Sequence, residues 1–485
     1  LIKQNELSRK YGYYDHVRRQ GIGLVQTVDK GKISRRNILN LKDTIVVNTP
    51  NYYLSYAVCA ICYWLLNQKG EANLYLNKAL ALNESKTSLL MTLVHLKLNR
   101  QTTALKWIKK YLSIQKPTEV SNDFICVIDA LANNSYNSSI TKEICELIDN
   151  WSNVLNNDKN IYDSNVQRWN DFFYKDVERV DLNLYPCINK FTENSDKLIE
   201  NIGIAESYQK IYDKFDSLFH NTKFEKQKSF DELLSSLINN YEKEELNLKK
   251  DILKDELIIK HNGDSVVADK EFNMSSLAYD KQTDFYTLLT NTLLDRNDVS
   301  PLTRKLAVSF LKKVLDDSFN SSVGDINSNV NITLKIDEWN AITTNGSNEK
   351  ELLNSVGSFA AMPYDKELKN NSYINVKTIL ASIFAILGIV LAFKYFLVGI
   401  AVMLVSLALN FYFIYDVIKI KNDIELEKQK GINIYETVVL NTVAEIVDAC
   451  FIIDRSKKKK EKVLDYINSF NSENNLNLRG DNYEQ

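Results

Sequence analysis

The chain has 485 residues, enough for two to four domains at roughly 100 to 200 residues each. Its 60 Lys and Arg residues nearly cancel its 62 Asp and Glu residues, so it lacks the excess positive charge of a general nucleic-acid binder, and nucleic acid is not an expected partner. Only 14 Gly and 5 Pro occur, and this scarcity of turn formers predicts a mainly α-helical fold. The single G-x-G, Gly21-Ile22-Gly23, lacks the third Gly of a phosphate-binding loop.

Residues that could carry chemistry are scattered along the chain. Cys59 and Cys62 have a C-x-x-C spacing, for which a metal site or redox pair is the alternative to core packing, yet no second C-x-x-C or paired His accompanies them. The four His residues stand singly, and acidic pairs such as Asp316-Asp317 point in different directions from a helix. We therefore predict no catalytic, cofactor-binding or metal-binding residues, no cofactor and no enzymatic activity.

Residues 1–50 form a basic N-terminal arm. The first 48 residues contain ten Lys or Arg and four Asp or Glu, together with Tyr11, Tyr13 and Tyr14. Such a basic aromatic segment suits acidic lipid, RNA or an acidic protein, and the alternative is an extension packed on the body. No apolar stretch of signal-peptide type is visible here, which predicts a cytoplasmic body.

From residue 51 small and large apolar residues recur at the spacing of paired antiparallel helices. A first copy carries Tyr56, Ala60, Tyr63, Ala72, Leu76, Ala79 and Leu82, and a weaker second copy carries Ser88, Met91, Thr92, His95, Ala104, Ile108 and Tyr111. These copies, over about residues 51–117, resemble the tetratricopeptide repeat. They depart from it at Glu84, where its closing Pro is expected, and at Asn67, which replaces the Gly between the helices. The resemblance implies helical repeats over 51–156 with a protein- or peptide-binding surface; the alternative is that the helices only form a core.

Residues 157–342 are expected to form a further helical domain with a small β element. Ser229 and Glu232 make a capping box for a helix that runs to Gly263. A second helix starts at Ser300-Pro301, where an N-cap residue precedes a Pro in the first turn.

The clearest strand in the sequence is Val330–Ile336, because apolar and polar residues alternate along it. A single strand needs a partner, and Ser265–Ala268 or the N-terminal segment around Gly23–Val28 are the expected ones. Residues 343–373 follow, with Asn-Gly-Ser and Asn-Asn-Ser sequences that are typical of a linker.

The strongest single feature is an apolar segment from Thr378 to Tyr415, in which Lys394 is the only charged residue among 38. A straight helix of that length would reach about 57 Å, twice the thickness of a hydrocarbon core. We therefore predict a transmembrane helical hairpin over 374–418, with spans Ile374–Phe393 and Tyr395–Tyr415 in contact with the lipid bilayer. A buried hairpin of a soluble protein is the alternative.

The residues around the hairpin predict its orientation. Basic residues flank both outer ends, and only Lys394 lies in the turn, so both termini are expected in the cytoplasm of a bacterium, at the inner or plasma membrane. The flanking residues are Lys366, Lys369, Lys377, Lys419 and Lys421. Small residues suited to helix contact are Ala381, Ala385, Gly388, Gly399 and Ala408.

Residues 419–485 are expected to form a cytosolic amphipathic helix and a basic tail. The helix is Ile432–Ile453, with Asn441, Glu445 and Asp448 on its polar stripe. The run 455–462 contains six basic residues and one Glu, which favours contact with anionic lipid, and the alternative is a solvated helix end.

Two classes of function fit this organisation. The first is a membrane-anchored scaffold or adaptor that recruits cytoplasmic proteins through its helical repeats. The second is an effector whose hairpins form a homo-oligomeric pore, lined by Ser382, Ser406 and Asn410. Polarity within the hairpin distinguishes the two classes, because a pore usually carries intramembrane ionisable groups and an anchor does not.

Overall fold

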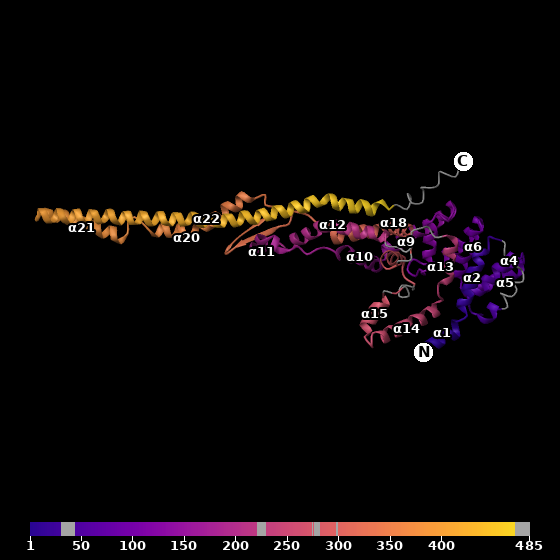
Figure 1. The fold of residues 1–485 in the computed structure, drawn as a ribbon. Coiled ribbons are helices and arrows are strands. Elements are labelled where there is room, and N and C mark those ends of the chain that lie inside the picture. Colours follow the sequence, from indigo (N-terminus) through magenta and orange to yellow (C-terminus); the bar gives the residue numbers. More distant parts are fainter. Residues whose placement is uncertain (31–43, 221–228, 274, 276–281, 297–298, 471–485) are drawn as a thin grey trace. The chain divides into compact units, whose positions relative to one another are not determined.

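The computed structural model describes residues 1–30, 44–220, 229–273, 275, 282–296 and 299–470. Helices dominate, and one small three-stranded sheet accompanies them, which confirms the mainly α-helical class (Figure 1). The chain divides into two compact units. The first contains Leu1–Asp176, Gln209–Gly324 and Glu461–Gln485, and the second contains Val177–Tyr208 and Asp325–Lys460.

All regular elements that the structure describes in the first unit are helices. Its elements are α1 (Ile2–Tyr11), α2 (Tyr14–Thr27), α4 (Tyr53–Leu65), α5 (Lys69–Leu82), α6 (Glu84–Lys97), α7 (Gln101–Ile114), α8 (Phe124–Ala132), α9 (Ser138–Asn157), α10 (Lys159–Tyr174), α13 (Phe230–Asn239), α14 (Lys243–Lys260), α15 (Ser265–Asn273), α17 (Phe285–Leu294), α18 (Pro301–Phe310), α19 (Lys312–Phe319) and the π-helical turn η2 (Asn320–Gly324). The second half of α12 (Asp196–His220) and the end of α22 (Phe396–Ser469) also belong to it.

Four helices of this unit, α4, α6, α8 and α14, end in the same way; in α14 the residue is Asn262, with φ of 52°, and the Gly263 N–H bonds to the Ile258 carbonyl at 2.9 Å. Asn67, Asn99 and Asn134 follow α4, α6 and α8 in the left-handed conformation, with φ of 58°, 55° and 51°. The next residue in each case closes a six-residue hydrogen-bonded turn: Gln68 N–H to Tyr63 at 2.9 Å, Arg100 N–H to His95 at 2.8 Å, and Ser135 N–H to Ala130 at 2.9 Å. Asn tolerates this conformation better than most residues do, which explains how Asn67 can stand where the repeat has Gly.

Helices α4 and α5 pack as a pair, and so do α6 and α7. The third turn leads to a different arrangement, in which α9 packs against α7 and α10, while α8 packs against α13 and α18. Two similar helix pairs are therefore followed by helices with other neighbours. Identification of the pairs as tetratricopeptide repeats stays a prediction.

The described part of the N-terminal arm is a packed extension. Helix α1 lies against α14, and α2 lies against α4 and α13. Arg18 of α2 is 3% exposed and forms an ion pair with Glu245 of α14, which is 1% exposed. Lys3 pairs with Asp255 at 2.7 Å. Acidic side chains of α14 thus receive part of the arm's positive charge; residues 31–43 of the arm lie outside the described residues.

The helix expected from Ser229 to Gly263 is two helices. The capping box of Ser229 and Glu232 is confirmed at the start of α13, but the backbone becomes extended at Asn240, with ψ of 133°, before α14 begins. The Tyr241 ring at this break lies 5.1 Å from the Arg18 guanidinium carbon and 3.9 Å from Lys249 Nζ. The prediction of one helix was wrong because Arg18, which contacts Tyr241 at the break, comes from α2. The periodicity of residues 229–263 contains no information about a contact with so distant a helix.

The second unit contains the sheet. Strands β1 (Thr192–Glu193), β2 (Ile332–Ile336) and β3 (Trp339–Thr343) pair antiparallel in the order β1-β2-β3. The predicted strand at 330–336 is confirmed as β2, but both expected partners were wrong, because Ser265–Ala268 lies in α15 and Gly23–Thr27 lies in α2. A turn at Asp337, with φ of 51°, instead lets β2 pair with the segment that follows it.

The second unit also contains helical elements. They are the 3-10 turn η1 (Leu182–Leu184), α11 (Pro186–Phe191), the first half of α12, α20 (Glu349–Asn370), α21 (Val376–Ala392) and most of α22. The core joins the inward residues of β2, such as Ile332 and Leu334, to Val439, Val443 and Ile446 of α22. The apolar residues that alternate along β2 therefore pack against apolar residues at helical spacing along α22, and together they form one apolar layer.

The segment 343–373, expected to be a linker, contains α20, a helix of 22 residues. Its Leu352 and Val356 are buried in the core of this unit. The Asn-Gly-Ser sequence before it is a tight turn in which Gly346 has φ of +79°. A Cβ atom at Gly346 would come within 2.7 Å of the Val447 side chain of α22, so this turn is pressed against the long helix.

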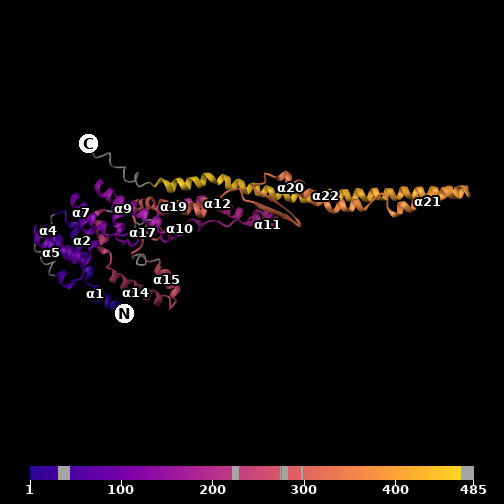
Figure 2. The same cartoon turned by 180° about the vertical axis from the view of Figure 1, so that it is seen from behind.

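Helix α22 is continuous over 74 residues, and the two views show it as one unbroken helix (Figures 1 and 2). It includes the expected amphipathic helix Ile432–Ile453 and the basic run 455–462. No Pro occurs between Phe396 and Ser469, and isolated Gly residues such as Gly431 cost a helix only about 1 kcal/mol each.

The expectation of two membrane spans is met only in part. Helix α22 is long and apolar enough to cross a membrane, and 11% of its most apolar 18-residue window is buried. Helix α21 has 17 residues, which corresponds to about 25 Å and falls short of a hydrocarbon core of about 30 Å. Asn375 is the N-cap residue of α21, and its side chain forms a capping box with Thr378. The helix therefore begins at Val376, and the first two residues of the predicted span, Ile374 and Asn375, are not helical.

Candidate functional site

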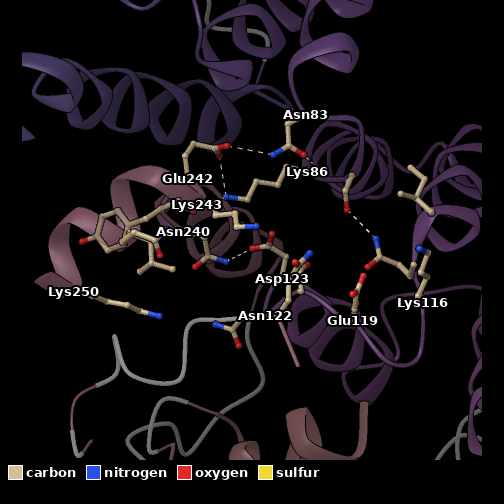
Figure 3. Close-up of a pocket in the computed structure, with 18 residues that line it drawn as sticks. Asn83, Lys86, Lys116, Glu119, Asn122, Asp123, Asn240, Glu242, Lys243 and Lys250 are labelled. Atoms are coloured by element: carbon tan, nitrogen blue, oxygen red, sulfur yellow. Dashed lines mark hydrogen bonds and ion pairs between the residues drawn. The ribbon is translucent and has the colours of Figure 1, made fainter. Parts of the chain in front are cut away.

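A polar pocket of about 510 Å³ lies in the first unit. It is formed by the start of α6, the end of α7, the segment that leads into α8, and the break between α13 and α14. Its lining is dominated by amides, lysines and carboxylates (Figure 3). The lining residues are Asn83, Ser85, Lys86, Ile114, Gln115, Lys116, Glu119, Ser121, Asn122, Asp123, Asn240, Tyr241, Glu242, Lys243, Leu246, Asn247, Lys250 and Gln282.

One wall of the pocket is held by Lys86 and Glu242. Lys86 Nζ donates to the Tyr241 carbonyl at 2.8 Å and to Glu242 at 3.0 Å, and the Asn83 amide donates to the same carboxylate at 3.3 Å (Figure 3). Asn83 also caps α6 by accepting the Lys86 N–H at 3.0 Å. The start of α6 is thereby connected to the residue that precedes α14, and the polar groups of this wall are satisfied.

The opposite wall is the segment 115–123. Val120 forms an antiparallel bridge with Thr283, with N–O distances of 2.7 and 3.1 Å. Asp123 at the end of this segment is 6% exposed and accepts a hydrogen bond from the Asn240 amide at 2.5 Å (Figure 3). A buried carboxylate therefore faces lysines across a space large enough for a peptide segment.

A buried ion pair lies next to the residues that line the pocket. The Arg18 guanidinium donates to Glu245 at 3.0 Å and, through its second nitrogen, makes a further hydrogen bond to the same carboxylate. It also lies 5.6 Å from the centre of the Tyr52 ring, and burial raises the pKa of Tyr52 well above its ordinary value. Tyr52 stacks on Tyr14 with ring centres 4.0 Å apart. These contacts hold α2, α4 and α14 together next to the Tyr241 break.

The Cys59–Cys62 pair lies within α4, where the two residues are 1% and 2% exposed. Burial raises the pKa of Cys62 to about 12. A thiolate is needed for metal binding or redox exchange, so this environment favours core packing. Within the described ranges, no cluster of three or more His, Cys, Asp or Glu is placed to hold a metal ion.

The apolar helices α21 and α22 are a second region that could carry function. They pack where their small residues meet: a Cβ atom at Gly388 would lie 2.8 Å from the Met403 nitrogen, and one at Gly399 would collide with the backbone of Ala392. Ala381 and Ser406 are also buried here. Lys394 lies in the short turn between the two helices.

Two of the three polar residues once expected to line a pore have partners within this helix pair. Ser382 donates to the Thr378 carbonyl at 2.8 Å, and the Asn410 amide donates to Ser382 at 3.3 Å. Ser406 is 4% exposed. Their polar groups are therefore directed into the pair and its backbone more than toward a continuous polar surface.

The basic run 455–462 is far from this region along the helix. Forty residues separate Tyr415 from Arg455 in the continuous helix α22, which corresponds to about 60 Å. Contact of this run with anionic lipid stays a prediction.

No family model, no curated protein and no solved structure matches the chain. The candidate sites therefore rest on their own geometry. Sequence reasoning singled out no residue as part of the polar pocket, and no local signal was present, because the lining comes from residues around 83, 115–123, 240–250 and 282.

Proposed function

We propose that the protein is a membrane-anchored adaptor that recruits a cytoplasmic protein through its first unit. The observation that carries this proposal is the apolar surface of α21 and the start of α22, where Phe384, Leu397 and Phe411 are 54%, 81% and 73% exposed. Surface of this kind is stable in lipid and costly in water. Between Thr378 and Tyr415 the one charged residue is Lys394, in the turn between the helices, and this composition is that of an anchor.

In this proposal α22 crosses the bilayer and α21 runs back beside it. The ends of the pair that join α20 and the rest of α22 lie on the cytoplasmic side, since Lys366, Lys369, Lys419 and Lys421 flank them. A single Cys at position 394 in a Cys-free background should then react with an external, membrane-impermeant maleimide, while one at position 366 should not. The reverse labelling pattern would contradict this topology.

The polar pocket is the proposed partner site. Its amides can pair with the main chain of an extended peptide, and Lys116, Lys243 and Lys250 can receive acidic side chains. The two neighbouring helix pairs, which resemble tetratricopeptide repeats, support this proposal because that family consists chiefly of scaffolds and adaptors.

The test uses the full chain in its own membranes. The protein should remain with the membrane through an alkaline wash, because screening charge does not release an apolar helix. A photo-crosslinking residue at Ser85, in the pocket, should capture a discrete partner, whereas the same residue at Lys142, which is exposed on α9, should not. Lys243→Glu should reduce capture at Ser85 at least tenfold, and Lys142→Glu should leave it unchanged. Equal capture from both positions would argue against the pocket.

A homo-oligomeric pore is the alternative function, and the polar residues Ser382, Ser406 and Asn410 are the observation in its favour. The contacts of Ser382 and Asn410 with each other and with the backbone favour an anchor. Depolarisation of cells by the intact chain, abolished when all three residues are replaced by Ala, would establish the pore instead.

A further inference from the structure

A second hollow, of about 270 Å³, lies among α4, α5, α6 and α7. Its lining combines aliphatic side chains with aromatic and basic ones. The lining residues are Ala60, Ile61, Trp64, Ala72, Asn73, Leu76, Met91, Val94, His95, Arg100, Thr103 and Trp107. The hollow is distinct from the polar pocket, with which it shares no residue.

Arg100 supplies a positive charge at this hollow. Its guanidinium carbon lies 4.3 Å from the centre of the Trp64 ring, a stacking distance that holds the side chain in place. Over the described part of the chain, no carboxylate forms an ion pair with Arg100. Its position follows from the left-handed turn at Asn99, which brings the Arg100 backbone N–H to the His95 carbonyl at 2.8 Å.

His95 supplies a second polar group. Its Nδ1 atom is buried and has no hydrogen-bond partner within the described structure. The ring meets Trp64 edge-on, with centres 5.4 Å apart. Burial, and then the charge of Arg100, lower the pKa of His95 to about 4, so the imidazole is neutral at pH 7 and keeps one donor and one acceptor.

We infer that this hollow binds a small apolar carboxylic acid, with its carboxylate at Arg100 and its apolar body between Leu76, Met91 and Trp107. An unpaired guanidinium presents a planar donor fork that matches a carboxylate. The buried Nδ1 of His95 can donate a further hydrogen bond to the carboxylate in the tautomer that carries the proton on Nδ1. The volume is slightly below the 300 to 1,000 Å³ that is usual for drug-sized ligands, so a fragment-sized acid fits.

The inference is independent of the adaptor proposal, and its test uses the full-length protein in lipid nanodiscs. Binding of 3-phenylpropanoate and indole-3-propanoate is measured by isothermal titration, with empty nanodiscs as the blank. The matching primary amides are the ligand controls. Both acids should bind saturably, and each amide should bind at least tenfold more weakly, because it offers Arg100 no negative charge.

Variants locate the binding. Arg100→Gln should weaken acid binding at least tenfold and remove the preference for acid over amide. Lys106→Gln, an exposed position on α7 outside the hollow, is the matched control and should change neither. Leu76→Phe should fill the hollow and reduce binding of acids and amides alike. It provides an independent variant if Arg100→Gln does not fold, as judged by circular dichroism.

Several results would overturn the inference. They are the absence of saturable binding of either acid, equal binding of acids and amides, or retention of the acid preference in Arg100→Gln. Binding of a heptapeptide with a C-terminal Phe and a free carboxylate is measured as the last comparison. If that peptide binds through Arg100 and the free acids do not, the hollow recognises a chain terminus and the small-acid inference fails. Crosslinking at Ser85 is unaffected by any of these outcomes, which keeps the two proposals separable.

Discussion

The carboxylate of Glu445 in α22 accepts the backbone N–H of Cys187, at the first turn of α11, with distances of 2.9 and 3.1 Å. It also accepts the Ile188 N–H at 2.9 Å. A helix start normally leaves such N–H groups without partners, and here a residue 258 positions away in the sequence supplies the cap. This contact joins α11 to the long helix within the second unit.

Replacement of Glu445 by Ala should therefore lower the free energy of unfolding by about 1 to 3 kcal/mol, because two N–H groups lose a charged acceptor. Glu445→Gln should retain part of this free energy, since the amide oxygen still accepts. Denaturant unfolding followed by circular dichroism gives both values. Asp448→Ala, an exposed position on the same helix, is the control and should have little effect. A loss of similar size in Asp448→Ala would show that helix charge, and not the cap, is responsible.

The buried pair of Arg18 and Glu245 leads to a second prediction. Arg18→Leu should lower the free energy of unfolding by about 3 to 5 kcal/mol, because it leaves a buried carboxylate without its main partner. Adding Glu245→Leu should restore much of the loss, since no unpaired charge then remains. The double-mutant cycle is measured by denaturant unfolding, with Lys3→Ala in an exposed ion pair as the control. Additive losses in the double variant would contradict this account.

Gly346 provides a third prediction. Gly346→Ala should lower the free energy of unfolding by roughly 1 to 3 kcal/mol, because φ of +79° is strained for Ala and its Cβ atom would press on Val447 and Val443. Gly70→Ala is the matched control: it lies in α5 with open space around it, so the same change should be neutral or stabilising by up to about 1 kcal/mol. Equal effects at the two positions would rule out a special role for the turn.

His95 should make stability depend on pH. Its pKa is about 4 in the folded protein and 6.5 for an ordinary His, so between these values the unfolded chain binds a proton that the folded chain does not. The stability that comes from the neutral ring is therefore complete above pH 6.5 and is lost as the pH falls toward 4. The free energy of unfolding of the wild type should drop more between pH 7.5 and pH 5 than that of His95→Gln.

Thr103→Ala serves as the control for this comparison, because it changes the same hollow without removing a titratable group and should leave the pH dependence as in the wild type. A wild-type profile parallel to that of His95→Gln would show that His95 titrates normally in the folded protein. Carboxylates that titrate in this range contribute equally to all three proteins and cancel in the difference.

Local patterns were sufficient for several elements. Alternation from Val330 to Ile336 identified β2, since a strand buried on one face repeats every two residues. The capping box of Ser229 and Glu232 identified the start of α13, because both of its hydrogen bonds form within four residues. The apolar composition of Thr378–Tyr415 identified the segment that contains the start of α22, the helix long and apolar enough to cross a membrane, although the length of α21 differed from the expected span.

Other features depended on contacts between distant residues. Helix α13 ends before Tyr241, where Arg18 and Lys249 surround the ring, and a periodic pattern does not contain that information. The strand partners of β2 also depended on the turn at Asp337 and on Thr192–Glu193, which is too short to show alternation.

The sequence by itself determined that this protein is mainly helical, has one well-defined strand and carries an apolar helix, because composition and periodicity are properties of neighbouring residues. Only the tertiary structure decided which side chains meet in the candidate sites. Lys86, Asp123 and Glu242 come from three separate stretches and share one pocket. Arg100 and Trp64 stack across two helix pairs. Such groupings arise because packing of apolar faces brings distant segments together, and the polar residues at their edges gain their partners only when that packing is complete.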